Sequence, residues 1–187
     1  MDSAKFFTHI KPLFSNKFTQ KQVDGINHIL SAIVNAGITD LRYIAYILAT
    51  VFHETANTMQ PIKEYGRGKG YDYGKKLKMS RKPYVSPDVI FYGRGLVQLT
   101  WFENYASMGK LLKIDLLNNP DLALYPDISA QIMIKGMTKG FFTGKALSNY
   151  FNEKVSDWVN ARKIINGLDK AVQIADYAKI FYNGLLQ

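Results

Sequence analysis

The segment LRYIAYILATVFHETAN, residues 41–57, decides how the rest of the chain must fold. A helix built from it has apolar side chains on nearly every side: Leu41, Ile44, Ala45, Ile47, Leu48, Val51 and Phe52. A helix that is apolar all round is buried all round, and Asp40 before it is a typical N-cap residue. We therefore expect a central helix that the rest of the chain surrounds and that ends on His53-Glu54-Thr55.

Helical periodicity also covers most of the sequence on either side of this segment. It predicts an early short helix up to Pro12 and a second helix after Thr19, which forms a capping-box pattern with Gln22. Further helices are expected over residues 101–112, 127–142, 145–151, 155–165 and 169–186. Residues 59–87 instead alternate Gly, Tyr, Lys and Pro, which predicts a long loop region with at most short strands. The expected fold class is mainly α.

The composition is that of an ordinary globular domain. The chain has 187 residues, of which 47% are hydrophobic and 21% charged, so we expect one domain over residues 1–187. The absence of cysteine excludes disulfides, thiolate metal sites and a thiol nucleophile. The first residues do not have the pattern of a signal peptide. We therefore expect a soluble protein that is made in the cytoplasm and that another protein must release if its substrate lies outside the membrane. We also expect a monomer.

A formal net charge of +9 predicts attraction to polyanions. Residues 63–88 carry eight basic and three acidic residues, so much of the excess falls in the predicted loop region. This surface could bind nucleic acid, an anionic cell envelope or an acidic glycan. Net charge is the only feature that suggests nucleic acid, so we expect no specific nucleic-acid binding. The apolar last helix could insert into an outer membrane, but packing on the core is the favoured interpretation.

Two glutamates stand where they would experience opposite environments. Glu54 ends the central helix, and burial raises the pKa of a carboxyl group, as a general acid requires. Glu64 lies ten residues later among glycines and lysines, where solvent and cations favour a carboxylate base. Two such carboxyl groups are what glycoside hydrolysis needs. The alternative is that both are ordinary surface charges.

Three segments add a resemblance to a known family. They are His53-Glu54-Thr55, then FYGRGLVQLT at residues 91–100, and Ile164-Ile165-Asn166-Gly167. In order and spacing they resemble glycoside hydrolase family 19, and within it the phage endolysins. The resemblance implies a lysozyme-like α-helical fold with a glycan cleft. It also implies an inverting mechanism without metal or cofactor, in which one carboxyl group protonates the leaving oxygen and another activates water.

The resemblance also implies roles for individual residues. Glu54 corresponds to the general acid and Thr100 to the residue that holds the attacking water. Substrate-cleft residues correspond to Gln98, Asn104 and Asn166. Glu64 is the second carboxylate by analogy with the endolysins, with Asp72 in reserve.

Two residues of the middle segment are interpreted from their chemistry. Gly93 and Gly95 predict a tight turn around Arg94, whose expected role is to brace the catalytic pair. Tyr92 is the tyrosine expected to offer its ring to a sugar. A zinc site of the His-Glu-x-x-His type is excluded because Asn57 stands in place of the second histidine.

The favoured function is a phage endolysin that cuts the glycan backbone of bacterial peptidoglycan as a muramidase, after a holin-type protein releases it from the host cytoplasm. Two departures argue against chitin. Glu103 stands where chitinases carry a tyrosine, and the arginine that they carry after the Asn-Gly motif has no clear counterpart near residues 176–179. A chitinase acting on chitin oligomers stays the alternative, followed by a non-enzymatic module that binds nucleic acid or cell wall.

Overall fold

The computed structural model describes residues 2–68 and 91–187. The helices are α1 (Ser3–Ile10), α2 (Gln20–Asn35), α3 (Leu41–Glu54), α4 (Phe102–Leu112), α5 (Pro126–Lys139) and α6 (Ala171–Leu185). Short 3-10 helices are η1 (Lys11–Phe14), η2 (Pro120–Leu124), η3 (Leu147–Asn149) and η4 (Asn160–Ile164), and the strands are β1 (Ile62–Lys63) and β2 (Arg94–Gly95). The expected mainly α fold is confirmed, and no helix of the described part is long and apolar enough to cross a membrane.

Helix α3 is the central helix that the sequence predicted. Every residue from 44 to 52 is buried, and Asp40 caps the helix by accepting a hydrogen bond from the backbone N–H of Arg42 at 2.8 Å. The ring of Phe52 makes edge contacts with Phe14 and Tyr177, with centroid distances of 5.0 and 4.9 Å. Helix α6 packs along α3, and α1 packs on α6. The catalytic candidate Glu54 is therefore the last residue of the best-buried helix.

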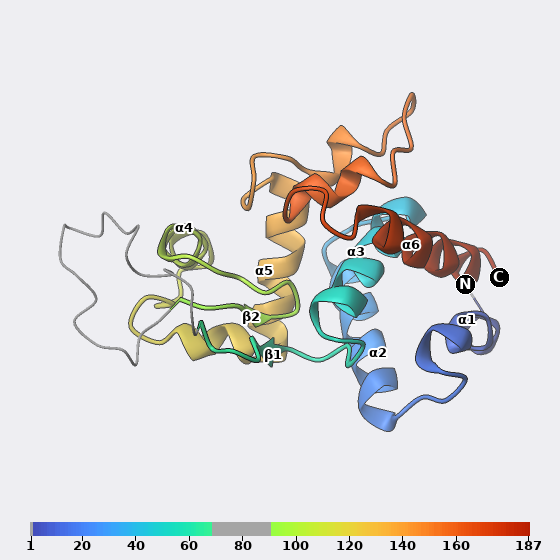
Figure 1. Ribbon diagram of the computed structural model, residues 1–187, viewed down its shortest axis with the longest axis horizontal. Coiled ribbons are helices and arrows are strands. Elements are labelled where there is room, and N and C mark those ends of the chain that lie inside the picture. Colours follow the sequence, from blue (N-terminus) through green and yellow to red (C-terminus); the bar gives the residue numbers. More distant parts are fainter. Residues whose placement is uncertain (1, 69–90) are drawn as a thin grey trace.

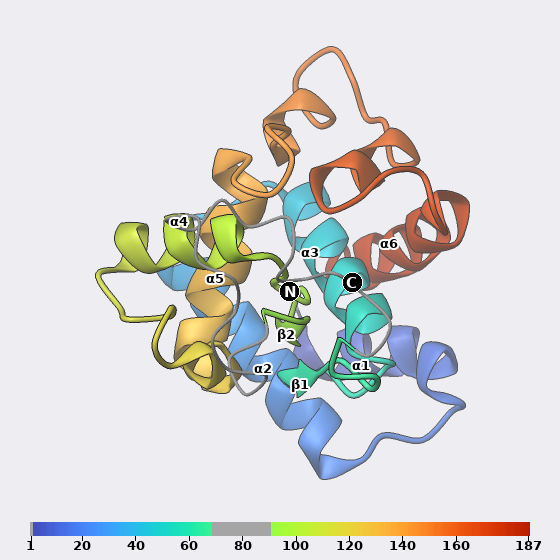
Figure 2. The ribbon, with the colours of Figure 1, turned by 60° about the vertical axis from the view of Figure 1, so that its left-hand side comes forward.

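The elements form two groups on either side of α5. Helices α1, α2, α3 and α6 lie together, whereas α4, β1, β2 and η2 lie on the other side (Figure 1). The segment that follows α5, with η3 and η4, runs back toward α3 and α6 and extends beyond them at one end of the molecule (Figures 1 and 2). Side chains from the α3 group, from the group with α4 and the strands, and from the segment after α5 can therefore meet at the end of α3.

Hydrogen bonds attach the link, the segment between α3 and β1, to helix α2. The Gln22 side chain donates to the carbonyl of Asn57 at 2.9 Å, and the Gln60 side chain donates to the carbonyl of Lys21 at 2.6 Å. The Thr55 hydroxyl donates to the Val51 carbonyl and accepts from the N–H of Met59. These bonds set the path of the chain between the two glutamates.

The two predicted helices at 145–151 and 155–165 are wrong, because only the 3-10 turns η3 and η4 form there. Short polar side chains bind the backbone in place of helical hydrogen bonds. Asn149 accepts from the N–H of Ala146, and Asp157 accepts from the N–H of Asn160. The hydrophobic periodicity could not predict this, because it does not show which side chains compete for the backbone hydrogen bonds.

Gly25 gives a test of the fixed link. A methyl group at this position of α2 would lie 2.1 Å from the carbonyl oxygen of Met59, so Gly25→Ala must push the link away from the helix. We expect the free energy of unfolding to fall by about 1–3 kcal/mol in urea titrations. Ser31→Ala, at an exposed position of the same helix, is the control and should change stability little. Equal stability of both variants would contradict the tight contact.

Candidate active site

Three regions of the chain line one cavity of about 480 Å³. Helix α3 contributes Glu54, the strand region contributes Glu64 and residues of the segment 93–104, and the chain after α5 completes the wall. The lining residues are Glu54, Glu64, Gly93, Val97, Gln98, Leu99, Thr100, Trp101, Asn104, Phe142, Arg162, Ile165 and Asn166. Six side chains predicted for the site from the sequence therefore share this cavity: Glu54, Glu64, Gln98, Thr100, Asn104 and Asn166.

Glu54 is paired with an arginine that sequence reasoning missed. Arg162 Nη1 donates to Glu54 Oε1 at 2.6 Å, and the two side chains are only 4% and 14% exposed. Arg162 Nε also donates to the carbonyl of Asp169 at 3.2 Å, which fixes the guanidinium plane. With Oε1 held, the other oxygen of Glu54 is the one that can carry and deliver a proton. The sequence signal for this pairing was weak, because Arg162 stands directly before a second basic residue, Lys163.

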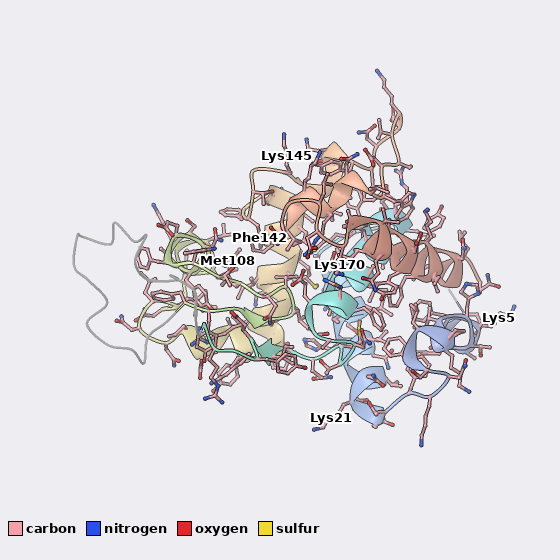
Figure 3. All side chains as sticks on the ribbon, in the orientation of Figure 1. Lys5, Lys21, Met108, Phe142, Lys145 and Lys170 are labelled. Atoms are coloured by element: carbon pink, nitrogen blue, oxygen red, sulfur yellow. The ribbon has the colours of Figure 1, made fainter. Side chains whose placement is uncertain are left out.

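His53 precedes Glu54 and lies within its electrostatic reach. Burial lowers the pKa of the His53 imidazole, the Glu54 carboxylate opposes this effect, and the Arg162 guanidinium adds to it. Lys170, which lies close to the end of α3 (Figure 3), lowers the same pKa further. His53 is therefore neutral at pH 7, which leaves Arg162 as the cation in contact with Glu54.

Glu64 is fixed from the other side by the strand pair. Strand β1 pairs antiparallel with β2, with Lys63 opposite Arg94. The backbone N–H of Glu64 donates to the carbonyl of Gly93 at 2.7 Å, and Glu64 Oε2 accepts from the N–H of Gly93 at 3.0 Å. One carboxylate oxygen is thus committed, and among the described residues Oε1 has no hydrogen-bond donor and can accept from a water. The reserve candidate Asp72 lies outside the described residues.

The predicted water-holding residue Thr100 follows a tight turn at residues 96–98. Gln98 and Trp101 on either side of it have φ angles of 51° and 70°, and such left-handed conformations of non-glycine residues concentrate at functional sites. Asn104 Nδ2 donates to the Thr100 carbonyl at 2.9 Å. Gln98 Nε2 donates to the carbonyls of Ile62 and Gly95. Gln98 therefore also joins the strands, a role that the sequence did not predict.

The aromatic residues on the cavity wall are Trp101 and Phe142, neither of which was predicted. Phe142 follows α5 (Figure 3) and packs over Gly136, where an added methyl group would overlap its ring. The next residue, Thr143, donates its hydroxyl to the carbonyl of Lys163 at 2.6 Å. The loop that presents Phe142 is thereby tied to the segment that carries Arg162 and Asn166.

Tyr92 and Arg94 occupy a different place from the one expected. The Arg94 side chain is 2% exposed, and Cζ lies 3.7 Å from the centre of the Tyr92 ring. Arg94 Nε donates to Asp121 Oδ1 at 2.7 Å, and Lys63 Nζ donates to Asp121 Oδ2 at 2.6 Å. Tyr92 is 8% exposed and is not among the residues lining the cavity. Among its described contacts Arg94 therefore binds Asp121, and any support that it gives to Glu64 passes through the strand pair β1–β2.

No group of three or more His, Asp or Glu side chains within residues 2–68 and 91–187 is arranged to hold a metal ion. The two carboxyl groups in the cavity, Glu54 and Glu64, come from separate elements and can transfer protons. The hydroxyl of Thr100 and the amides of Asn104 and Asn166 supply hydrogen bonds in the same cavity.

The Asp121 cluster makes stability depend on pH. Partial burial would raise the pKa of Asp121, but hydrogen bonds from Lys63 and Arg94 outweigh it and hold the pKa below its ordinary value of 3.8. The stabilisation is complete above that ordinary value and disappears as the pH falls through the lowered one. We expect Asp121→Asn to lower the melting temperature at pH 7 and to reduce its fall below pH 4. The control is Asp176→Asn, exposed on α6, which should leave the acid transition of the wild-type protein unchanged. If Asp121→Asn also showed the wild-type acid transition, the stabilising role of the cluster would be refuted.

Removing Arg162 should expose the cost of burying Glu54. Breaking one side of a buried ion pair costs about 3–5 kcal/mol because the other charge stays unpaired. We expect Arg162→Met to lose stability on this scale in chemical unfolding, and Glu54→Gln in the same background to restore part of it. A double variant no more stable than Arg162→Met would mean that the pair does not couple the two residues.

Comparison with known proteins identifies the family to which the chain is similar. The model of chitinase class I, glycoside hydrolase family 19, matches residues 28–140. Endochitinase 1 of Theobroma cacao is 38% identical over 101 residues, which are 49% of this chain and 31% of that protein. The inactive chitinase-like protein 1 of Hevea brasiliensis is 35% identical over 92 residues, 45% of this chain and 29% of that protein. The chain thus spans about a third of the length of these relatives.

Solved structures share the fold. Chitinase C of Streptomyces griseus HUT6037 matches 96% of this chain and 76% of its own, with a TM-score of 0.68 and 24% identity. A bacterial family 19 chitinase matches 95% of this chain and 93% of its own, with a TM-score of 0.59 and the same identity. At this identity the likeness concerns the fold alone, whereas the family model covers more than half of the sequence. The chain belongs to glycoside hydrolase family 19.

Proposed function

We propose that the protein hydrolyses β-linked chains of N-acetylated amino sugars with inversion of configuration. The observation that carries the proposal is the shared cavity, in which Glu54 and Glu64 enter from different elements. Each has one carboxyl oxygen held by a hydrogen-bond donor and the other available for chemistry. Inverting glycosidases need this division into an acid and a base with room for water between them.

The proposed reaction needs one proton donor and one proton acceptor. Glu54 protonates the glycosidic oxygen while the bond from that oxygen to the anomeric carbon breaks. Water held by Thr100 attacks the same carbon from the opposite face, and Glu64 takes its proton. Glu54 ends as a carboxylate and Glu64 as an acid, and a proton exchange with solvent restores both.

Chitin-type oligomers are the first substrate to test. The relatives in the comparisons bear the names of endochitinases and chitinases, and this likeness supports chitin better than any feature of the chain supports another glycan. Trp101 and Phe142 on the cavity wall would provide apolar faces for sugar rings.

Peptidoglycan is the second candidate, and the charge of the chain favours it. Bacterial cell wall is anionic, and a protein with a net charge of +9 is attracted to it. Glu103, exposed on α4 directly before Asn104, also departs from the chitinase pattern. A muramidase-type endolysin role belongs to this second candidate.

Rates of reducing-end release from chitin oligomers and from purified peptidoglycan test the proposal. We expect Glu54→Gln and Glu64→Gln each to slow the preferred reaction by roughly 10²–10⁴-fold, the range by which acid–base groups accelerate reactions. Glu103→Gln is the charge-matched control and should keep the rate on small oligomers within about twofold of wild type. Activity of Glu54→Gln at the wild-type rate would overturn the mechanism, and hydrolysis of neither glycan by the wild-type protein would overturn the function.

A further inference from the structure

A stripe of polar side chains runs inward from the catalytic candidate along α3. Tyr46, Thr50 and Glu54 are spaced four residues apart, so they lie on one face of the helix. Tyr46 is 0% and Thr50 1% exposed. The hydroxyl group of each is buried without a hydrogen-bond partner in the described part of the protein. Buried hydroxyls are normally bonded, so two adjacent exceptions behind an active site need a physical reason.

The same arginine acts on both ends of this stripe. Burial raises the pKa of Tyr46, and the Arg162 guanidinium opposes that rise, so Arg162 lies within electrostatic reach of the phenol. At the other end, Arg162 Nη1 contacts Glu54 at 2.6 Å. A guanidinium has five N–H donors, and the two bonds described for Arg162 use only two of them. The arginine therefore has donors to share with the stripe.

The remaining neighbours do not satisfy the two hydroxyls. The ring of Phe151 lies 5.5 Å from that of Tyr46 and offers no acceptor. The Asp157 carboxylate accepts hydrogen bonds from Asn160 and is bonded to neither hydroxyl in the described part of the protein. The ionisable groups around the stripe and the Glu54 pair are His53, Tyr150, Asp157, Arg162, Asp169 and Lys170.

We propose that Tyr46 and Thr50 are positioning residues that jointly bind one internal water, which connects them to Arg162 and so fixes the direction of the Glu54 carboxyl. A buried water is stable when two to four polar groups surround it, and the groups that would surround this one are the two unpartnered hydroxyls and the remaining donors of Arg162. The inference rests on the proposed function, because its consequence is the alignment of Glu54 with the leaving oxygen. A misplacement of about 1 Å can cost roughly a hundredfold in rate.

Isosteric variants test the water site. Tyr46→Phe and Thr50→Val remove one hydroxyl each, and we expect each to lower kcat by about tenfold to a hundredfold while KM stays within about twofold. The pH dependence of kcat should shift, because the electrostatic surroundings of Glu54 change with the position of Arg162. Since both hydroxyls hold the same water, the double variant should be no slower than the slower single one. Thr138→Val on α5, whose hydroxyl donates to Ile134, is the control and should keep the wild-type kcat.

The outcomes separate this inference from the function on which it rests. If both variants keep the wild-type kcat and pH profile, the hydroxyls are merely tolerated and the inference is wrong. If wild-type protein cleaves no glycan, the proposed function is wrong. Thermal unfolding of the variants then tests whether the water site exists. In that case the shifts in Tm caused by Tyr46→Phe and Arg162→Met should be non-additive; additive shifts would overturn the inference without any activity measurement.

Discussion

The ion pair between Arg162 and Glu54 is the interaction on which the architecture depends. An unpaired carboxylate at the end of a helix as apolar as α3 would be strongly destabilising. The chain after α5 removes this cost by returning to α3 with Arg162, and the bond from Thr143 to the Lys163 carbonyl holds the returning segment to the loop that carries Phe142. The ion pair that stabilises the fold thereby also builds one wall of the cavity.

The opposite wall depends on a second arginine–carboxylate contact. Arg94, a residue of strand β2, has a buried side chain that is joined to Asp121, which Lys63 on strand β1 also contacts. Because Glu64 follows Lys63 directly, the charges that fix the strand pair also fix the candidate base. Each candidate catalytic carboxyl group is thus positioned by a buried arginine on its own side of the cavity, one in direct contact and one through the strands.

Local sequence patterns predicted the features that depend on neighbours in the chain. The apolar run of residues 41–57 predicted α3, and the Thr19–Gln22 capping box is present. Arg162 could not be found in this way, because it meets Glu54 across 108 positions of sequence. Tyr92 is not among the residues lining the cavity. Composition identifies an aromatic ring but not the side to which it turns, and Arg94 lies over this ring.

The two glutamates stand on separate elements around a cavity of about 480 Å³, a space that admits a water between substrate and base. Retaining enzymes instead bring the second carboxyl group to about 5 Å from the first so that it attacks the sugar itself. Proton NMR of the first product formed from the glycan that the protein cleaves distinguishes the two arrangements most directly. Inversion predicts that a β-linked substrate releases the α-anomer first. Initial release of the β-anomer would contradict the roles assigned to Glu54 and Glu64.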